Sequence, residues 1–174
     1  PTKKYVILER RDDLGGTWDL FKYPGIRSDS DMFTLGFRFK PWRSTQWIAD
    51  GPAIKNYIRE AAVENGIDKH IRYGQRVVGA DWSDEDNRWT VTIEHAGERS
   101  TIQCGFMMAC SGYYDYDEGY TPDFPGIENF GGTVVHPQQW PEDLDYAGKK
   151  VVVIGSGATA VALLPALVDT GVGH

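Results

Sequence analysis

Apolar and polar side chains alternate with a period of two in several stretches of the chain, which predicts strands. Residues 5–9 read Tyr-Val-Ile-Leu-Glu and are typical of a buried strand that ends in an acid. Three further segments alternate in the same way: residues 71–82, 88–95 and 99–109. The acidic run at residues 84–87 supplies a turn between the first two. These segments predict a small β-meander that leads into a buried apolar strand at residues 106–109.

A period of 3.6 residues predicts two helices, one in the middle of the chain and one near its end. The middle helix begins near Pro52 and stops before Gly66, because proline suits the first helical turn and glycine suits the residue after the last. Its apolar face consists of Ile54, Tyr57, Ile58, Ala61 and Ala62. The second helix runs from Ala158 to about Asp169. Pro165 lies inside it and is expected to kink it or to remove one hydrogen bond.

Two long stretches, residues 10–50 and 112–149, show neither period and are rich in glycine and aromatic residues. Loops of such length inside a compact domain usually have a function. The first stretch contains five aromatic side chains, Phe33, Phe37, Phe39, Trp42 and Trp47. We expect them to pack in a core rather than to line a substrate pocket, because large aromatic side chains are mostly buried.

The segment Gly155-Ser156-Gly157-Ala158-Thr159-Ala160 follows the pattern G-x-G-x-x-A. It lies between residues 149–154, which predict a buried parallel strand, and the second helix. In such a loop the first glycine permits a tight turn, the second admits a pyrophosphate, and the small third residue lets the helix approach the strand. The helix N-terminus adds N–H donors and a partial positive charge. Together these features predict a dinucleotide-binding loop.

The composition narrows the classes of function. A net charge of −7 argues against nucleic-acid binding, which needs a basic surface. The chain contains no apolar run of the roughly 18 to 20 residues that span a bilayer, and the sequence before the first strand does not resemble a signal peptide. Cys104 and Cys110 are expected to be buried free thiols, which fits a cytoplasmic protein.

Residues 130–141 read Phe-Gly-Gly-Thr-Val-Val-His-Pro-Gln-Gln-Trp-Pro and match the pattern F-x-G-x-x-x-H-x-x-x-W-P. Two more segments accompany this fingerprint, Leu14-Gly15-Gly16-Thr17-Trp18 and Tyr23-Pro24-Gly25-Ile26-Arg27-Ser28-Asp29. In all three the chain resembles the class B flavoprotein monooxygenases of Baeyer–Villiger type, and the resemblance runs along its whole length. The Trp-Pro ending is usually absent from the related N-hydroxylating and ordinary flavin-containing monooxygenases.

The resemblance implies an α/β fold with two Rossmann-like units, one for FAD and one for NADP. Residues 1–146 would form a partial FAD-binding domain with the β-meander and the fingerprint linker. Residues 147–174 would begin the NADP-binding domain. No glycine-rich turn precedes the first strand, and the catalytic arginine of the family is missing. We therefore expect an internal fragment of a longer protein that is inactive by itself.

The resemblance also implies the cofactor-binding residues. The carboxylate of Glu9 would hold the ribose of FAD, although a solvated charge at a strand end is the plainer interpretation of that residue alone. The other residues expected near FAD are Gly16, Thr17, Trp18, Asp19, Leu20, Arg27, Ser28, Asp29 and Val77. NADP would bind Gly155, Ser156, Gly157, Ala158, Thr159 and Ala160.

Two residues are candidates for a role in catalysis. Asp29 would lie near the flavin and the nicotinamide and orient the missing arginine, whereas without the family it would be interpreted as a helix or turn cap. His136 is either a catalytic residue or a structural residue that holds the linker between the two units, and the structural role is favoured. Neither a second His nor a Cys lies at ligand spacing from His136, so we expect no metal site.

The implied activity is monooxygenation that depends on FAD and NADPH. NADPH would reduce FAD, and O₂ would add to the reduced flavin as a C4a-peroxyflavin. One oxygen atom would then be inserted next to the carbonyl of a ketone or added to sulfur in a sulfide or thioamide. The partners would be O₂ and a small ketone or sulfur-containing substrate.

Two alternatives stay open, a flavin-containing monooxygenase that acts on nitrogen or sulfur and a non-catalytic nucleotide-binding fragment. A flavin-dependent disulfide reductase is disfavoured, because Cys104 and Cys110 do not have the spacing of a redox pair.

Overall fold

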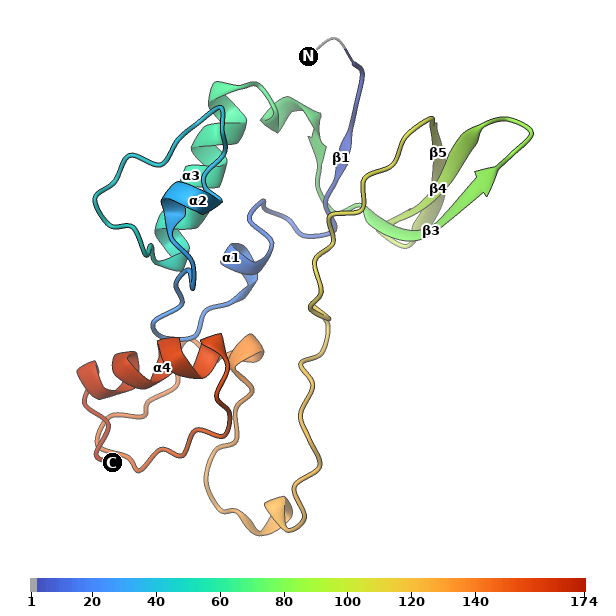
Figure 1. The fold of residues 1–174 in the computed structure, drawn as a ribbon. Coiled ribbons are helices and arrows are strands. Elements are labelled where there is room, and N and C mark those ends of the chain that lie inside the picture. The colour runs from blue at the N-terminus through green and yellow to red at the C-terminus, as the bar shows by residue number, and fades with distance from the viewer. Residues whose placement is uncertain (1–2) are drawn as a thin grey trace. The chain divides into compact units, whose positions relative to one another are not determined.

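The computed structural model describes residues 3–174, which form helices, short strands and long connecting loops (Figure 1). Contacts within the chain divide it into two compact units. Unit 1 contains the residues up to Gly16 together with Tyr57–Tyr113, and unit 2 contains Thr17–Asn56 and Tyr114–His174. This division follows contacts between residues and not the binding of cofactors, so the domain boundary predicted near residue 146 stays a prediction.

Unit 1 opens with a short parallel pair of strands. β1 (Ile7–Leu8) pairs with β2 (Ile71–Arg72), which follows the 3-10 helix η1 (Asp68–His70). Beyond the strands, Glu9 N donates to Arg72 O at 3.0 Å and Gln75 N donates to Glu9 O at 2.9 Å. The predicted first strand is present but short, because a strand extends only as far as a partner pairs with it.

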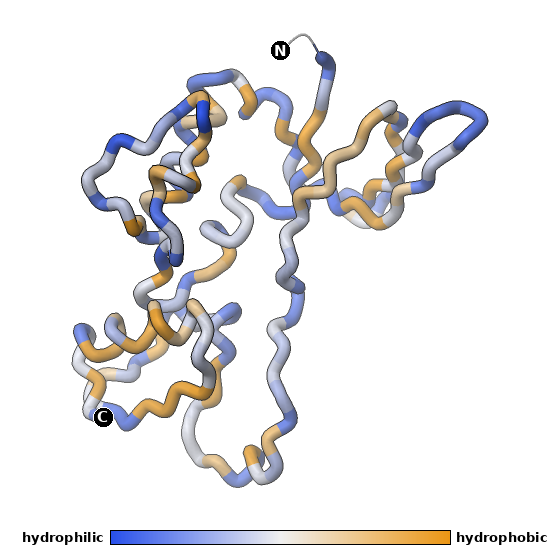
Figure 2. The backbone as a smooth tube through the Cα atoms, in the orientation of Figure 1, coloured by the Kyte–Doolittle hydropathy of each residue, from blue (hydrophilic) through white to orange (hydrophobic). Residues whose placement is uncertain are grey.

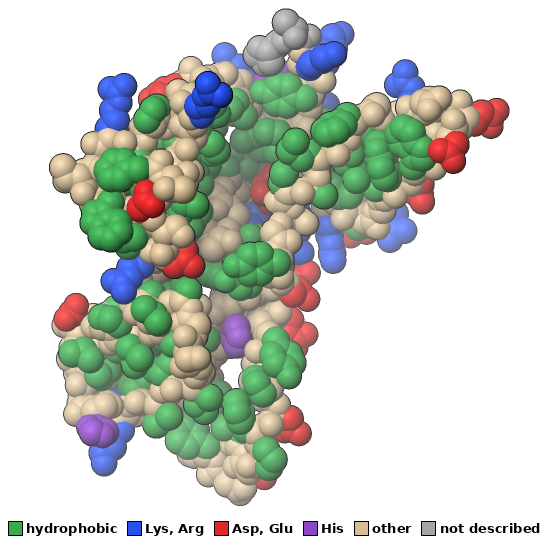
Figure 3. Space-filling model, in the orientation of Figure 1, with side chains coloured by type: hydrophobic (Ala, Val, Ile, Leu, Met, Phe, Trp, Pro, Cys, Tyr) green, Lys and Arg blue, Asp and Glu red, His purple; other side chains and the backbone are tan. Residues whose placement is uncertain are grey.

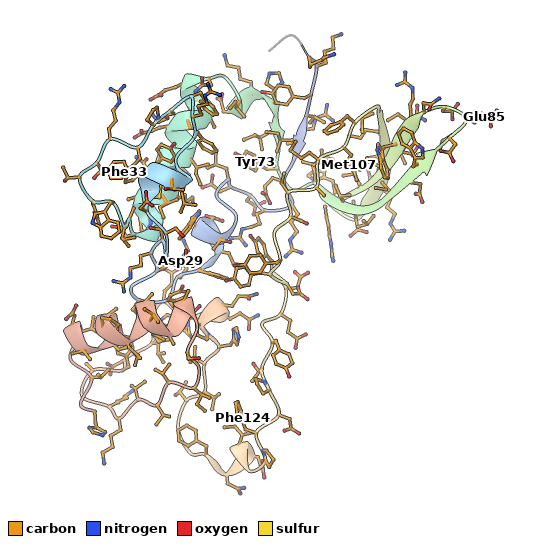
Figure 4. All side chains as sticks on the ribbon, in the orientation of Figure 1. Asp29, Phe33, Tyr73, Glu85, Met107 and Phe124 are labelled. Atoms are coloured by element: carbon orange, nitrogen blue, oxygen red, sulfur yellow. The ribbon has the colours of Figure 1, made fainter. Side chains whose placement is uncertain are left out.

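The predicted β-meander is confirmed as a three-stranded antiparallel sheet in the order β3-β4-β5. The strands are β3 (Arg76–Ser83), β4 (Arg88–His95) and β5 (Glu98–Cys104). Ala96 and Gly97 join β4 to β5 with φ of 51° and 83°, the positive values that a tight two-residue hairpin loop needs. The loop between β3 and β4 carries Glu85 at its tip (Figure 4). The buried side chains of the sheet belong to the central strand β4.

Three predictions for unit 1 are wrong in whole or in part. The alternating segment at 71–82 is broken between β2 and β3, where Gly74 turns with φ of 66°. The buried strand expected at 106–109 is absent, since Phe106 is 76% exposed and Met108 is 73% exposed. An apolar run becomes a strand only where its backbone finds a partner, and no residue between 3 and 174 pairs with this run. Cys110 is exposed rather than buried, and Cys104 is half-buried.

The predicted central helix is confirmed as α3 (Gly51–Glu64). Asp50 Oδ1 accepts a hydrogen bond from Ala53 N at 2.7 Å and caps the first turn. The predicted apolar face is buried at Ile54, Tyr57, Ala61 and Ala62 and half-buried at Ile58. Gly66, with φ of 65°, follows the last turn as expected of a helix stop.

Unit 2 is organised around α4 (Ala158–Asp169), whose bounds match the prediction and which contains Pro165. Its core cluster consists of Phe21, Tyr23, Ala162, Leu163 and Leu167. The partly buried residues around this cluster are Leu20, Ile26, Trp140, Tyr146, Val151, Val153 and Val172. The other elements of unit 2 are α1 (Thr17–Leu20), α2 (Met32–Leu35), η2 (Ile127–Asn129) and η3 (Pro137–Gln139). The core thus joins both long loop stretches to α4.

The buried parallel strand predicted at 149–154 is not formed among the described residues. Val151 N donates to His174 O at 2.8 Å and Gly173 N donates to Lys149 O at 2.9 Å, so this segment has a backbone partner at the end of the chain. Val152 and Ile154 are 84% and 73% exposed, and the segment shows as an apolar stretch in Figure 2. A parallel strand is buried only when both of its faces are covered, and here α4 covers one.

The aromatic side chains of residues 33–47 were expected in a core, and this prediction is wrong. Phe33, Phe37, Phe39 and Trp47 are 62%, 40%, 58% and 58% exposed. Phe37 and Phe39 stack on each other with their ring centroids 5.1 Å apart. Figure 3 shows hydrophobic side chains at the surface around α2. A core needs elements on both sides of a side chain, which the single short helix α2 and its loop do not supply.

Candidate functional site

The predicted dinucleotide loop leads directly into the N-terminus of α4. Gly155 has φ of 141°, a backbone conformation that L side chains rarely adopt. A Cβ placed on Gly155 or Gly157 would meet no atom within 4 Å, and residues 155–158 are all exposed. Gly157 is the N-cap, and within residues 3–174 no side chain caps the helix there. The first N–H groups of α4 are therefore accessible to an anionic ligand.

The segment Tyr23–Arg27 packs closely against α4. A Cβ on Gly25 would lie 2.4 Å from Ala162 O and 2.8 Å from Ala166 Cβ, so only glycine fits without displacing the helix. Arg27 Nη2 donates to Val161 O at 3.3 Å. The motif that ends in Asp29 is therefore held beside the helix that carries the dinucleotide loop.

Tyr23 packs against α4 in the core of unit 2. Its side chain is 5% exposed and belongs to the core cluster with Ala162 and Leu163. Burial is the largest cause that raises the pKa of Tyr23 above its ordinary value of 10.0, the neighbouring Thr159 side chain lowers this pKa, and the negative charge of Asp29 raises it. Tyr23 is therefore a neutral phenol at physiological pH.

Asp29 and Ser28 have opposite surroundings. Asp29 is exposed and lies on the loop between α1 and α2, where Figure 4 labels it. Ser28 is 2% exposed, and its Oγ accepts a hydrogen bond from Ala49 N at 3.1 Å. Ser28 N also donates to Ala49 O at 2.9 Å. Ser28 thus anchors the loop, while the carboxylate of Asp29 is left at the surface.

The α1 segment is fastened by its own polar side chains. Asp19 is buried, and its Oδ1 forms an ion pair with Lys55 Nζ of α3 at 2.5 Å. Thr17 Oγ1 lies 3.4 Å from the hydroxyl of Tyr116. Trp18 and Leu20 are half-buried. These contacts define the position of α1 within unit 2, and they are compatible with the backbone of α1 lining a ligand.

In unit 1 the structure brings together the segments of Glu9 and Val77. Gln75, two residues before Val77, donates its backbone N–H to Glu9 O at 2.9 Å. Glu9 Oε1 accepts a hydrogen bond from Arg11 N at 2.9 Å. Val77 is 45% exposed and lies at a β-bulge, since Val77 pairs with Ile93 and Gly79 already pairs with Thr92. Gly16 is the last residue of the first segment of unit 1, and its φ is 52°.

Tyr73 lies in the same part of unit 1, where Figure 4 labels it. Burial is the largest cause that raises its pKa, followed by the charge of Asp13. Arg59 lowers the pKa of Tyr73, and Glu9 and Asp68 raise it. Three carboxylates and the guanidinium of Arg59 therefore act together on the hydroxyl of Tyr73.

His136 caps the short helix η3. Its Nδ1 accepts a hydrogen bond from Gln138 N at 3.2 Å, which leaves the proton of the neutral ring on Nε2. A Cβ on Gly119 would lie 2.3 Å from His136 Nδ1, so the chain at Gly119 passes against the imidazole. The imidazole of His136 is thus in contact with η3 on one side and with the chain at Gly119.

The rest of the fingerprint helix reinforces this arrangement. The side-chain amide of Gln138 donates to Asp115 O, and that of Gln139 donates to Asp117 O at 3.2 Å. Trp140 packs on the core cluster and meets Tyr146 edge-on, with their ring centroids 5.8 Å apart. The fingerprint thus fastens residues 115–119 to the unit that carries the dinucleotide loop.

Three contacts at the site were not found from the sequence. Lys55 is the partner of Asp19, Gly119 packs on His136, and Gly25 packs on Ala162 of α4. Gly25 belongs to the motif at residues 23–29, so the sequence did contain a signal for its close packing. No periodicity or spacing connects Lys55 to Asp19 or Gly119 to His136.

Among residues 3–174, no group of three or more His, Cys, Asp or Glu side chains is arranged to hold a metal ion. No helix in the same range has the length and apolar character needed to cross a membrane.

The chain is similar to known monooxygenases over its whole length. It is 71% identical over 174 residues to the FAD-containing monooxygenase EthA of Mycolicibacterium smegmatis, covering 100% of this chain and 35% of that protein. A steroid monooxygenase bound to NADP matches 95% of this chain and 32% of its own, with a TM-score of 0.78 and 28% identity. OTEMO in complex with FAD and NADP matches 98% of this chain and 33% of its own, with a TM-score of 0.76 and 31% identity. The chain thus spans about a third of the length of these relatives.

These similarities confirm the predicted resemblance and the α/β, Rossmann-like fold class of class B flavoprotein monooxygenases. The matching family model is described as "Flavin-binding monooxygenase-like" and covers residues 46–170. That range includes α3, the β-meander, the fingerprint and the dinucleotide loop. The chain belongs to the flavin-binding monooxygenase-like family.

Proposed function

We propose that this chain is part of an FAD- and NADPH-dependent monooxygenase of Baeyer–Villiger type. The reaction inserts one oxygen atom of O₂ next to the carbonyl of a ketone or adds it to sulfur in a small organic substrate. The observation that carries the proposal is that one unit holds the fingerprint, the dinucleotide loop and the Asp29 motif around a common core. EthA is named as FAD-containing, and OTEMO is described in complex with FAD and NADP.

The dinucleotide loop fits NADP. Its glycines leave open space where a pyrophosphate would lie, and the N-terminus of α4 offers N–H donors that no side chain within residues 3–174 caps. The residues that would hold the dinucleotide are Gly155, Ser156, Gly157, Ala158, Thr159 and Ala160. Residues 147–174 would accordingly begin the NADP-binding domain, after a partial FAD-binding domain at residues 1–146.

The segments proposed for FAD would contact it through one carboxylate and through backbone groups. Glu9 directly follows β1 and has one carboxylate oxygen bonded to Arg11 N, so its second oxygen suits a ribose hydroxyl. Val77 lies on the segment that pairs with Glu9, and its bulge leaves backbone groups outside the regular ladder. The backbone of Gly16 through Leu20 and the segment Arg27–Asp29 would contact the flavin side of the cofactor. When bound and reduced by NADPH, FAD supplies the oxygen-activating chemistry.

The residues of this chain would contribute position and charge. Tyr23–Arg27 places Asp29 beside the helix of the dinucleotide loop. The exposed carboxylate of Asp29 would orient a cationic group near the nicotinamide. His136 would act by holding residues 115–119 in register, because the chain at Gly119 lies against its imidazole and its Nδ1 is bonded within η3. We place the reaction in the cytoplasm, where NADPH is supplied.

The experiment uses the full-length protein that contains this chain. The purified protein is expected to be yellow, and NADPH is expected to bleach the flavin, which O₂ then restores. With ¹⁸O₂ and a simple cyclic ketone or an aryl methyl sulfide, the product is expected to carry one ¹⁸O atom. A protein that stays colourless with added FAD, or one that oxidises NADPH only to release peroxide, would overturn the proposal.

The Asp29→Ala variant refines the same test. It is expected to keep the flavin and to fold normally, because Asp29 is exposed, and to lose most of its coupled oxygenation. Asp31→Ala is the matched control, since Asp31 is a nearby carboxylate engaged in capping α2 through Thr34 N at 2.8 Å. Unchanged oxygenation in Asp29→Ala would remove Asp29 from the site.

A further inference from the structure

Pro165 interrupts the hydrogen bonding of α4 near its middle. In an α-helix the carbonyl of residue 161 accepts a hydrogen bond from the N–H of residue 165, and proline has no N–H. The proline ring also crowds that carbonyl and pushes it away from the helix axis. Val161 O therefore lacks the partner that residue 165 would otherwise supply.

Arg27 bonds to the carbonyl that Pro165 leaves open. Its Nη2 donates to Val161 O at 3.3 Å. Arg27 and Pro165 also line the same hollow in the surface of unit 2, together with Gly25 and Ala162. Gly25 lies so close to α4 that a Cβ on it would collide with Ala162 O. The segment at residues 25–27 and the turn of α4 that contains Pro165 thus match each other in shape and in hydrogen bonding.

The backbone that carries Arg27 is itself held in place. Residues 26–28 are joined to residues 49–51, at the start of α3, by two backbone hydrogen bonds of 2.9 Å. Between these bonds, Arg27 pairs with Asp50 in an antiparallel bridge. Asp29 follows on the same segment, where Figure 4 labels it. A shift of α4 relative to Arg27 would therefore also be a shift relative to Asp29.

We propose that Arg27 is a positioning residue for the nicotinamide dinucleotide, because its guanidinium holds the carbonyl that Pro165 leaves open and thereby fixes α4 relative to Asp29. This inference rests on the function proposed above and adds Pro165 and the side chain of Arg27 to it. The loop at residues 155–158 leads into the same helix. The N–H donors of α4 and the carboxylate of Asp29 would accordingly meet the dinucleotide at a set spacing.

The first test replaces Pro165 in the full-length holoenzyme. Pro165→Ala restores an N–H inside α4, so the carbonyl of Val161 turns back into the helix and away from Arg27. The Kd for NADP⁺ and the KM for NADPH are expected to rise by about threefold to tenfold, the effect of one hydrogen bond. The flavin content and the kcat at saturating NADPH are expected to stay within a factor of about two, as for a loss of binding alone.

Thermal unfolding distinguishes this effect from damage to the fold. The unfolding temperature of Pro165→Ala is expected to be unchanged or higher, because alanine suits a helix interior better than proline. A weaker affinity in an equally stable protein is not expected from general destabilisation. Pro52→Ala is the matched control, since Pro52 lies in the first turn of α3, where no helical partner for an N–H exists.

A double-mutant cycle tests whether Arg27 and Pro165 act through the same bond. Arg27→Met removes the guanidinium and keeps most of the alkyl stem, and it is expected to weaken NADP⁺ binding while the flavin is retained. In the Pro165→Ala background the same change is expected to add nothing, because the bond to Val161 O is already lost. Arg43→Met is the matched control, since Arg43 is an exposed arginine of the same unit and its loss changes the net charge equally.

The outcomes separate this inference from the proposed function. If the unaltered enzyme binds neither flavin nor nicotinamide, both proposals fail. If it binds NADP⁺ and Pro165→Ala leaves the Kd unchanged, only the positioning role fails. Additive effects of Arg27→Met and Pro165→Ala would also overturn that role, as would loss of flavin from Arg27→Met or an equal effect of Arg43→Met.

Discussion

The two glycines of the dinucleotide loop are glycine for different physical reasons. Gly155 has φ of 141°, so its backbone requires glycine whether or not a ligand binds. Gly157 has φ of −79° and ψ of −177°, a conformation open to any residue, and a Cβ there would meet no atom within 4 Å. The fold therefore does not require glycine at position 157, and the proposed ligand provides the reason for it.

The variant Gly157→Val is expected to fold normally and to bind nicotinamide poorly. The valine side chain would occupy the space of the pyrophosphate and remove at least one charge-assisted hydrogen bond, which raises the Kd for NADP⁺ by roughly tenfold to a hundredfold. The measurement is a titration of the flavin spectrum with NADP⁺, together with thermal unfolding. Gly105→Val serves as the control, because Gly105 is equally open. Equal losses of affinity in both variants would argue against the role of Gly157.

At the scale of elements, the fingerprint holds the preceding loop at residues 115–119 in place through hydrogen bonds and packing. η3 is capped by His136, sends the amides of Gln138 and Gln139 to residues 115 and 117, and continues into Trp140 in the core. The two amide bonds join segments 23 and 22 residues apart in the sequence. The imidazole of His136 lies directly against the chain at Gly119, so a substitution at either residue affects the same contact.

A substitution at Gly119 is therefore expected to reproduce the loss of His136. In the full-length enzyme, Gly119→Ala would push the imidazole away from Gln138 N and lower the unfolding free energy by about 1 kcal/mol, with slower turnover and retained flavin. In the His136→Ala background the same change is expected to cost almost nothing, because the ring is absent. Gly131→Ala is the control, since a Cβ there meets no atom. The unfolding free energy is measured by thermal unfolding, and turnover is measured at steady state. Additive effects of Gly119→Ala and His136→Ala would contradict the predicted coupling of the two residues.

At the scale of the whole molecule, the chain exposes more surface than its size requires. Its accessible surface is 12609 Å², whereas two separate compact units of these sizes would together expose roughly 10,000 Å². Much of the apolar part lies on residues 33–47, 106–108 and 152–154. Large exposed apolar patches mark surfaces that meet other protein or that associate without specificity.

We therefore expect residues 1–174, expressed alone, to associate with themselves and to bind FAD no better than weakly. Gel filtration with added FAD is expected to give a broad or early peak with little yellow colour, and a dye that senses apolar surface is expected to fluoresce. The full-length protein, treated in parallel, is expected to give a single yellow peak without dye fluorescence. A monomeric peak of the short chain with one FAD per molecule would show that it needs no further covering.

The elements that the sequence predicted well are those stabilised by neighbours along the chain. α3, α4 and the β-meander depend on helical periodicity, caps and tight turns, all of which act within a few residues. The dinucleotide loop and the fingerprint are also local patterns, and they led to the family before any contact was known. The proposed roles of Asp29, Glu9 and His136 follow from that resemblance.

The tertiary structure alone decided which distant residues meet and which apolar segments are covered. The chain path brings together Gly25 and Ala162, Asp19 and Lys55, and Gly119 and His136, and no local pattern records such a pairing. The same holds for residues 106–109 and 149–154, whose apolar sequences are typical of buried strands. Periodicity reports what a side chain prefers, whereas burial also needs a partner strand and a covering layer, and these come from other parts of a fold.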